Sequence, residues 1–338
     1  MYLYWVQFCF TDHDALLQYL GHIQACAFPN STKRSMRSYF RSYLMFCQHF
    51  HFRPFPVTKR IYLFYLAFLA NSPSSYRSVL NYLSILTHVN RSLGCNLTFL
   101  RDYDVYLSQR AVRRLLGDYV ARKEPITIDI LLRVFSFFDF SNPLHICMRA
   151  LFLVAFFSFL RISNLVPYTL ADVRDPKGCY LRLSSVLFTA QGALLCVTRT
   201  KTIQFQQRVL EISLPYIPAS PLCPVTALRA YLANSPRPDQ SPLFGCRSRG
   251  SFQPILAHQY NAFIKASVAA IGLDPKKYAS HSFRRGGATF AFACHAPTAF
   301  IKAQGDWQSD AYLIYLQLSS ADKLKLLNSI TSRLSPQP

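Results

Sequence analysis

The stretch from His281 to Tyr315 is the part of this chain that decides its fold and its chemistry. It begins HSFRRGGAT at His281 and, after fifteen further residues, continues GDWQSDAYLIY from Gly305. The His and Arg284 lie three residues apart, and Trp307 is followed by a Tyr eight residues later. The imidazole, guanidinium and indole groups can donate hydrogen bonds to a phosphate, and a Tyr hydroxyl can attack one. The stretch therefore predicts a site that handles phosphate groups.

The charge of the chain indicates which phosphate is handled. Lys and Arg number 37 against 16 acidic residues, which gives a net charge of +21 over 338 residues. A charge of this size favours a polyanionic partner, and the natural polyanion that carries phosphates is nucleic acid. The hydrophobic fraction of 51% excludes a disordered polycation, and the length suffices for two domains with cores of their own.

Several other classes of protein do not fit the sequence. The longest apolar runs, Ile61–Ala70 and Ala150–Leu160, fall well short of the roughly twenty residues that a membrane-spanning helix needs. Residues Met1–Phe10 lack the basic start and small-residue cleavage site of a signal peptide, so none is expected. The ten Cys are scattered without a C-x-x-C pair, which argues against structural zinc and a disulfide framework. We expect a reducing intracellular compartment, no membrane partner and no small-molecule substrate.

The first third of the chain is predicted to be a helical DNA-binding domain covering residues 1–112. Apolar residues recur at helical spacing over Asp12–Ile23, Thr32–His49, Thr58–Ala70 and Ser74–Leu93. A basic linker at 113–125 would follow, and residues 126–338 would form a second domain. Basic residues interleaved with Tyr and Ser suit contacts to DNA phosphates. The candidates are Lys33, Arg34, Arg37, Arg41, Arg77, Arg113, Arg114, Arg122 and Lys123.

The second part is predicted to be mainly α-helical with a small antiparallel β-sheet. Helices are expected at Ile128–Asp139, Pro143–Leu160, Val225–Leu232, Gln259–Ile271, Arg284–Cys294, Pro297–Gln304 and Asp310–Leu318, with a tail helix at Ala321–Leu334. Three short strands, rich in Val, Leu, Ile and Thr, are expected at Tyr180–Phe188, Ala193–Thr200 and Gln207–Leu214.

Two further motifs complete a set. Arg161 lies in FLRISNL after a buried helix, and Lys201 lies in the tripeptide TKT between the second and third strands. The order Arg, Lys, His-x-x-Arg, Trp, Tyr resembles that of the tyrosine recombinase (phage integrase) family, over roughly Pro125 to Ala321. The local sequences HSFRRGGAT and GDWQSDAYLIYL look most like those of recombinases of eukaryotic DIRS-type and Crypton mobile elements. The resemblance implies two domains, a helical core-binding domain and an α+β catalytic domain.

The resemblance also implies a role for each residue of the set. Arg161 and Arg284 would bind the non-bridging oxygens of a DNA phosphate and stabilise the charge of the transition state. Lys201 would protonate the leaving 5′-oxygen, while His281 would accept the phenol proton or hold the phosphate. The indole of Trp307 can donate a hydrogen bond but cannot take a proton.

Tyr315 is the predicted nucleophile, and it would form a covalent 3′-phosphotyrosine. Tyr312, three residues earlier, is the alternative. The bond energy would be kept in the phosphotyrosine, so neither a metal ion nor a nucleotide cofactor is expected, in keeping with the scarcity of clustered acids.

Two positions depart from the family pattern. Asn164 stands where the family usually has an acid after its first Arg; an amide can still hydrogen-bond and orient its neighbours. Arg285 stands where a second His is common. It would be either a supporting contact to DNA phosphate or a surface charge.

The function that these features predict is site-specific DNA recombination or integration for a mobile element, in the nucleus, by a homotetramer on two double-stranded DNA sites. By resemblance, the tail helix would dock on a neighbouring protomer. Three alternatives remain open: a non-catalytic DNA-binding protein descended from such an element, a type IB topoisomerase, which shares the chemistry but acts alone, and a basic helical RNA-binding module.

Overall fold

The computed structural model describes residues 13–72, 75–119, 122–175, 178–205, 207–248 and 250–315, together with Leu324 and Leu327. The chain divides between residues 121 and 122 into two compact units, each with its own core. Apart from those two leucines, the predicted tail helix at Ala321–Leu334 lies outside the described residues. Within the described ranges, no helix combines the length and the apolar character needed to cross a lipid bilayer.

The first unit is built from helices. They are α1 (His13–Ala25), α2 (Asn30–His49), α3 (Lys59–Ala70), α4 (Tyr76–Ser92), a short 3₁₀ turn η1 (Thr98–Arg101) and α5 (Tyr103–Leu116). The four predicted helices are confirmed within a few residues, and α5 was not predicted. The hydroxyls of Thr58 and Ser75 cap α3 and α4 by accepting bonds from Ile61 N–H and Ser78 N–H. Apolar faces of α2 to α5, with Tyr43 and Tyr65 fully buried, form the core.

The predicted linker is structured at both ends. Helix α5 continues to Leu116, so Arg113 and Arg114 lie on its last turn, and Arg113 pairs with Asp118. Further on, the segment after residue 122 is held against the second unit. Lys123 Nζ donates to the Lys276 carbonyl (2.5 Å), Glu124 N–H to the Lys277 carbonyl (2.8 Å) and Ile126 N–H to the Ser282 carbonyl (3.0 Å).

The second unit combines helices with two small antiparallel sheets. Its helices are α6 (Ile128–Ser136), α7 (Pro143–Ser158), α8 (Ile162–Leu165), α9 (Leu170–Arg174), α10 (Pro224–Ala233), α11 (Ala257–Ala270), α12 (Ser280–Ala293) and α13 (Thr298–Gln304), with 3₁₀ turns η2 (Leu183–Ser185), η3 (Pro275–Lys277) and η4 (Asp310–Tyr315). One sheet has the order β1 (Val186–Phe188), β2 (Gly192–Val197), β3 (Leu210–Pro215), and the other pairs β4 (Gly245–Ser248) with β5 (Ser251–Pro254). The mainly α fold with a small antiparallel sheet is confirmed, whereas the second hairpin was not predicted.

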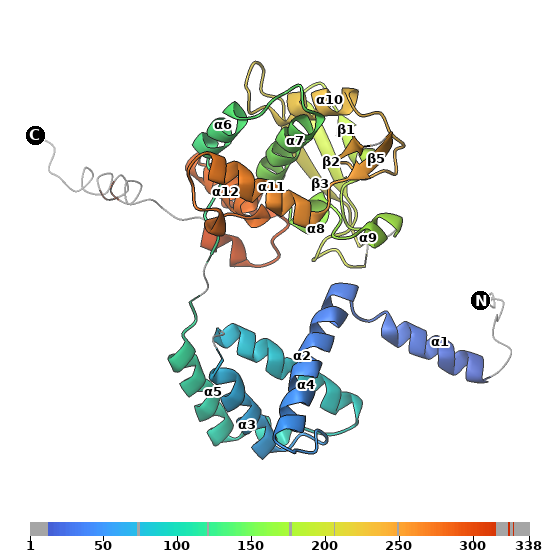
Figure 1. Cartoon of the computed structure of the whole chain (residues 1–338), viewed down its shortest axis with the longest axis vertical. Coiled ribbons are helices and arrows are strands. Elements are labelled where there is room, and N and C mark those ends of the chain that lie inside the picture. Colours follow the sequence, from blue (N-terminus) through green and yellow to red (C-terminus); the bar gives the residue numbers. More distant parts are fainter. Residues whose placement is uncertain are drawn as a thin grey trace, which may run out of the picture. The chain divides into compact units, whose positions relative to one another are not determined.

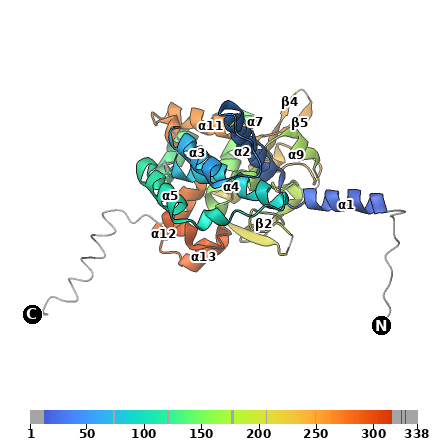
Figure 2. The same ribbon diagram turned by 90° about the horizontal axis from the view of Figure 1, so that it is seen from below.

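Helix α7 is the centre of the second unit. Nearly every side chain from Cys147 to Phe156 is buried, which explains why this stretch shows no polar face. Helices α10 and α12 and strand β3 pack around it. Figure 1 shows α7 inside the unit with the other helices and the β1–β3 sheet around it, and Figure 2 gives the same ribbon turned by 90°. The end of α7, which Arg161 follows by three residues, and α12, which bears His281 and Arg284, are therefore held in a fixed geometry.

Two consecutive glycines let α12 approach its neighbours closely. A Cβ added to Gly286 would lie 1.8 Å from the Ile126 carbonyl oxygen, and one added to Gly287 would lie 1.9 Å from the Phe156 carbonyl oxygen on α7. Real Cβ atoms do not come so near to backbone atoms, which cannot rotate away. The pair in HSFRRGG is therefore required for packing, and it sets the distance from α12 to α7.

We expect the change Gly287→Ala to lower the free energy of unfolding by about 3 kcal/mol, the upper end of the usual cost of overpacking a core. Urea unfolding followed by tryptophan fluorescence in a Trp5→Phe background, where the buried Trp307 is the remaining indole, measures the loss. Gly21→Ala on α1 is the control because its added Cβ meets nothing within 4 Å. Equal midpoints for the Gly287→Ala variant and the unmodified protein would contradict the close-packing argument.

Candidate active site

Arg161 is placed by a sharp turn at the end of α7. Phe159 caps this helix in the left-handed conformation (φ 52°), and Arg161 is the N-cap residue of α8. The Ser158 hydroxyl accepts a bond from Leu160 N–H (3.3 Å), and the Arg161 carbonyl accepts one from Asn164 N–H (2.8 Å). The turn thus fixes the backbone on both sides of the first predicted catalytic Arg.

Asn164 braces this corner against the segment that leads to Lys201. Its side chain is 1% exposed, and Nδ2 donates to the carbonyls of Cys179 (3.0 Å) and Arg199 (2.8 Å). An ionised carboxylate at this position could not make these bonds because it only accepts. The amide therefore has a structural role of its own, in line with the orienting role predicted for it.

Arg284 is enclosed by the protein and joins two of the predicted motifs. Its side chain is 1% exposed. Nη1 donates to the Phe159 carbonyl, two residues before Arg161, and Nη2 donates to the Gly305 carbonyl (2.8 Å). The guanidinium carbon also lies 3.8 Å from the ring centroid of Trp307, a close cation–π contact. Arg284 thus links the α7–α8 corner to the Gly305–Trp307 turn.

His281 begins the same helix and lies in a positive field. Its pKa is lowered to about 4, first by partial enclosure of the ring, which disfavours the charged form, and then by the charges of Arg284, Arg161 and Arg285. Although the side chain keeps exposed surface, its ring is neutral at physiological pH. A neutral imidazole can accept a proton, as the predicted role requires.

The low pKa of His281 has a measurable consequence. The unfolded chain would bind a proton at this residue below about pH 6.5, whereas the folded chain resists it down to about pH 4. The contribution of His281 to stability is therefore complete above about pH 6.5 and falls as the pH drops towards 4. We expect the His281 ring signals in an NMR titration to stay at their neutral positions from pH 8 to pH 5. The His281→Gln variant assigns the signals, and a midpoint near 6.5 would contradict the prediction.

Trp307 and Tyr312 pack together in a small separate cluster with Phe159, Ala288 and Ile301. Trp307 is 6% exposed and Tyr312 is 7% exposed, with ring centroids 6.1 Å apart. The buried ring of Tyr312 is suited to packing rather than to attack on a large substrate. The backbone of Tyr315 closes η4, and its side chain lies outside the part of the chain that the structure describes.

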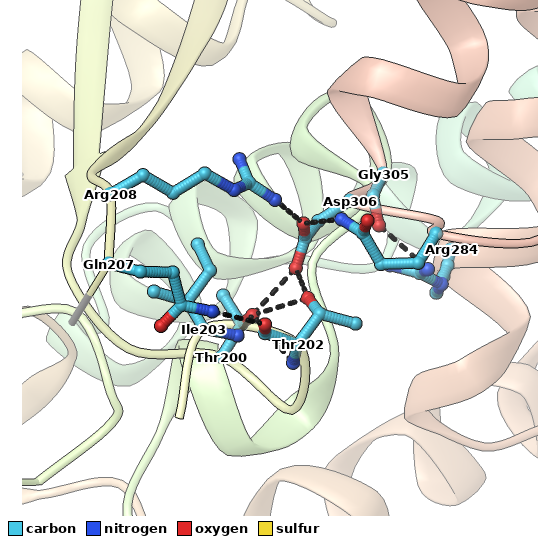
Figure 3. Close-up of polar contacts among 9 residues, drawn as sticks. Thr200, Thr202, Ile203, Gln207, Arg208, Arg284, Gly305 and Asp306 are labelled. Atoms are coloured by element: carbon cyan, nitrogen blue, oxygen red, sulfur yellow. Dashed lines mark hydrogen bonds and ion pairs between the residues drawn. The ribbon is translucent and has the colours of Figure 1, made fainter. Parts of the chain in front are cut away.

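Lys201 lies in the loop between β2 and β3, as predicted, with its side chain exposed. The loop is fastened by Asp306, whose side chain is only 2% exposed. The Asp306 carboxylate accepts bonds from Thr200 Oγ1 (2.6 Å) and Thr202 Oγ1 and pairs with Arg208 Nη2 (Figure 3). Burial alone would raise the pKa of Asp306, but the two hydroxyls and the Arg208 charge bring it below its usual value.

The structure brings most of the predicted set to one place. Arg161, His281 and Arg284 share one field, Trp307 stacks on Arg284, and the Lys201 loop is tied to the residue before Trp307. Asp306 was not predicted, because an Asp between Gly and Trp has the composition of an ordinary turn. The signal that could have found it is the pair of Thr residues that flank Lys201, two hydroxyls in need of an acceptor.

The predicted DNA contacts differ in their surroundings. Arg34, Arg37 and Arg41 are exposed on α2, where Lys33 is half-buried, and Arg77 is exposed on α4. Arg122 is exposed as well. Arg285, in contrast, is 6% exposed and donates through Nη1 to the Lys123 carbonyl (2.7 Å). The interpretation of Arg285 as a surface charge is therefore wrong, since its side chain is built into the attachment of the linker.

The described residues contain no group of three or more His, Cys, Asp or Glu that could hold a metal ion. The cysteines among them are free thiols, three of them buried. The side chains gathered at the site are thus cationic, aromatic and hydroxyl groups around one buried carboxylate. Such a set can bind an anion through several N–H donors and move protons through an imidazole and an ammonium.

Known proteins resemble this chain in sequence over part of its length and in fold. A scan against protein-family models finds no match. An integrase/recombinase described as a xerD homolog, from Selenomonas ruminantium, is 28% identical over 194 residues, which are 56% of this chain and 52% of the relative. The match thus spans about half the length of that protein.

Solved structures share the fold. A transposon Tn1549 integrase in complex with circular intermediate DNA aligns with a TM-score of 0.59 at 14% identity, covering 94% of this chain and 99% of that one. A lambda integrase dimer bound to a core site aligns with a TM-score of 0.55 at 15% identity, covering 91% and 96% of the two chains. The XerH recombinase bound to its difH substrate gives 0.54 at 12% identity, covering 87% and 77%. The chain therefore shares the fold of these integrases and recombinases, and the relative that it resembles in sequence over about half of that protein's length is also an integrase/recombinase.

Proposed function

We propose that this protein is a site-specific DNA recombinase that cuts and rejoins strands through a covalent phosphotyrosine. The observation that carries the proposal is the double link made by Arg284, which joins the corner bearing Arg161 to the turn bearing Trp307. Residues more than a hundred positions apart in sequence are thereby held around one site. Phosphoryl transfer depends chiefly on such fixed positioning and on the stabilisation of charge.

Each step has a residue suited to it. The Tyr315 oxygen would attack the phosphorus and form the new P–O bond, while its proton passes to the neutral ring of His281. Arg161 would stabilise the added negative charge on the non-bridging oxygens. Arg284, predicted to do the same, is enclosed with both terminal nitrogens on backbone carbonyls, so it would act through its charge and by holding the Arg161 corner in place. The bond from phosphorus to the 5′-oxygen would break as that oxygen takes a proton from the Lys201 ammonium. Rejoining runs the same steps in reverse with a new 5′-hydroxyl.

The cellular setting follows the resemblance. We propose double-stranded DNA as the partner, a homotetramer on two sites as the assembly, a mobile element of the DIRS or Crypton type as the source, and the nucleus as the compartment. The net charge of +21 supports the DNA partner. The similar transposon integrase and lambda integrase are described in complex with DNA, which supports the same partner here.

The test uses a pool of short nicked duplexes of randomised sequence, incubated with the protein in EDTA. On a nicked substrate the cut fragment diffuses away, so a covalent adduct accumulates and survives denaturation. We expect protein-linked DNA, and sequencing of the captured strands would give the preferred site. Tight binding without any adduct would overturn the proposal in favour of a non-catalytic DNA-binding protein. Relaxation of supercoiled plasmid by a monomer, without joined products from two sites, would favour a topoisomerase.

A further inference from the structure

The Asp306 carboxylate accepts hydrogen bonds from the residues on either side of Lys201. It accepts from Thr200 Oγ1 at 2.6 Å and also from Thr202 Oγ1, so the two immediate neighbours of Lys201 end on one acceptor (Figure 3). The carboxylate also pairs with Arg208, near the end of the same loop, and accepts from Gln308 Nε2 at 3.5 Å. One side chain therefore fastens the loop at both its beginning and its end.

The loop is organised around the same point. The hydroxyl oxygen of Thr200 accepts bonds from the N–H groups of Thr202 and Ile203, both at 3.1 Å. Gln207 Nε2 donates to the Thr202 carbonyl at 2.9 Å. The backbone around Lys201 thus turns about the Thr200 hydroxyl, whose own proton is given to Asp306. Loss of the acceptor would release both the hydroxyl and the turn that it orders.

Burying the Asp306 carboxylate costs free energy unless its charge is fully paired, so its hydrogen bonds and ion pair are needed for it to be tolerated at this position. Asp306 has a left-handed backbone (φ 52°), which Asn and Asp adopt more readily than other residues. It also lies between Gly305, whose carbonyl binds Arg284, and Trp307, which stacks on Arg284. The loop that carries Lys201 is therefore tied to the backbone turn that contacts the catalytic Arg.

The Lys201 ammonium has to be positioned by its surroundings if it is to donate a proton to one particular atom. Its side chain is long and exposed, and it belongs to a loop that spans the twelve residues between β2 and β3. Lys201, Arg208 and Gln308 line an open pocket of about 370 Å³ at this edge. A proton donor must come within hydrogen-bond distance of the atom it protonates, and a misplacement of about 1 Å can cost on the order of a hundredfold in rate.

We propose that Asp306 is a positioning residue for Lys201, holding its loop so that the ammonium meets the leaving 5′-oxygen during strand cleavage. This inference rests on the proposed recombinase function. The Asp306 side chain is buried, so it would not touch the DNA itself. It acts through Thr200, Thr202 and Arg208, and its effect should be confined to the step in which the leaving group is protonated.

The test compares two nicked duplexes that differ in one atom of the scissile bond. The first has the natural 5′-oxygen, and the second has sulfur in its place. A thiolate leaves without a proton because the pKa of a thiol is far below that of an alcohol. With oxygen, we expect Asp306→Asn to slow formation of the adduct by roughly tenfold to a hundredfold. With sulfur, we expect the variant to reach a rate within a few-fold of the unmodified protein.

Other variants serve as references for the rates that Asp306→Asn shows with the oxygen and sulfur substrates. Lys201→Ala should show a larger loss with oxygen and the same rescue with sulfur, whereas Arg161→Ala should be slow with both substrates. Asp310→Asn is the matched control because Asp310 is exposed and pairs with Lys302 at 3.0 Å. Thr202→Val removes one donor to the carboxylate and keeps the side-chain shape, which covers the case that Asp306→Asn does not fold. Its loss should be smaller and should also be rescued by sulfur.

A second measurement does not depend on cleavage. In hydrogen–deuterium exchange, the amides of Thr202 and Ile203 should exchange faster in Asp306→Asn, while the amides within β2 stay protected. Equal slowing on the oxygen and sulfur substrates would overturn the positioning role and leave a purely structural one. Unchanged rates on both would overturn it as well. If the unmodified protein forms no adduct with either substrate, the proposed function fails. Separately, if the amides of Thr202 and Ile203 exchange at the same rate in Asp306→Asn as in the unmodified protein, Asp306 does not hold the Lys201 loop.

Discussion

The Tyr315→Phe variant should form no covalent adduct on nicked DNA, because it keeps the ring and removes the attacking oxygen. Removal of a catalytic nucleophile typically lowers turnover on the order of 10⁴- to 10⁶-fold, which is below detection in a denaturing gel assay. DNA binding should be nearly unchanged, since affinity comes chiefly from contacts between basic side chains and phosphates. The measurement pairs the gel assay with a binding titration at fixed salt.

Tyr312→Phe is the control that tests the choice between the two tyrosines. The Tyr312 ring is 7% exposed and packs against Trp307, with centroids 6.1 Å apart. Phe keeps this packing, so the adduct should form at a rate within a few-fold of the unmodified protein. The reverse pattern, with cleavage by Tyr315→Phe and none by Tyr312→Phe, would overturn the assignment of the nucleophile. Peptide mapping of the adduct from the unmodified protein gives the same answer independently.

Arg284→Lys should fail although it keeps the positive charge. A Lys ammonium cannot span the Phe159 and Gly305 carbonyls, which the two terminal nitrogens of Arg284 contact at once. Loss of both links should displace the Arg161 corner and the Trp307 turn and slow cleavage on the order of a hundredfold or more. Stability should fall as well, by about 1.5–3 kcal/mol for each charge-assisted bond lost.

The two effects of Arg284→Lys can be separated. Cleavage is measured at low temperature after Trp307 fluorescence has shown that the second unit is folded. Arg133→Lys is the matched control, because Arg133 Nη2 also donates to a backbone carbonyl, that of Ile271 at 2.6 Å, away from the site. It should cleave at the full rate. A folded Arg284→Lys variant that cleaves within tenfold of the unmodified protein would show that the fork geometry of the guanidinium is not needed.

Much of the fold could be predicted from the sequence because its helices carry clear periodic signals. Four of the five described α-helices of the first unit and the central α7 agree with the prediction within a few residues, since apolar spacing and capping residues mark them. Helix α5 was missed because its basic residues in RAVRR resemble a charged linker more than an amphipathic helix. The β4–β5 hairpin was missed because its Gly, Arg and Ser residues lack the β-branched character of a typical strand.

The site shows a similar division. Motif order predicts which residues gather, and the structure brings the α7–α8 corner, the Lys201 loop and the start of α12 together. The connections made by Arg284 and Asn164 could not be predicted, because they end on backbone carbonyls, which have no sequence signature. Arg285 is the clearest case. It was interpreted as a surface charge or a contact to DNA, yet it is buried and binds the Lys123 carbonyl.

The amide at Asn164 affects how the site responds to pH, besides orienting its neighbours. Its amide ties the corner that bears Arg161 to the Arg199 carbonyl, two residues before Lys201. A carboxylic acid at this position would change its charge on protonation, and its bonds to neighbouring groups would change with it. A neutral amide has no such titration within the range in which proteins stay folded. This brace between the predicted catalytic Arg161 and the Lys201 loop therefore does not titrate, and any acid sensitivity of the proposed activity would come from other groups.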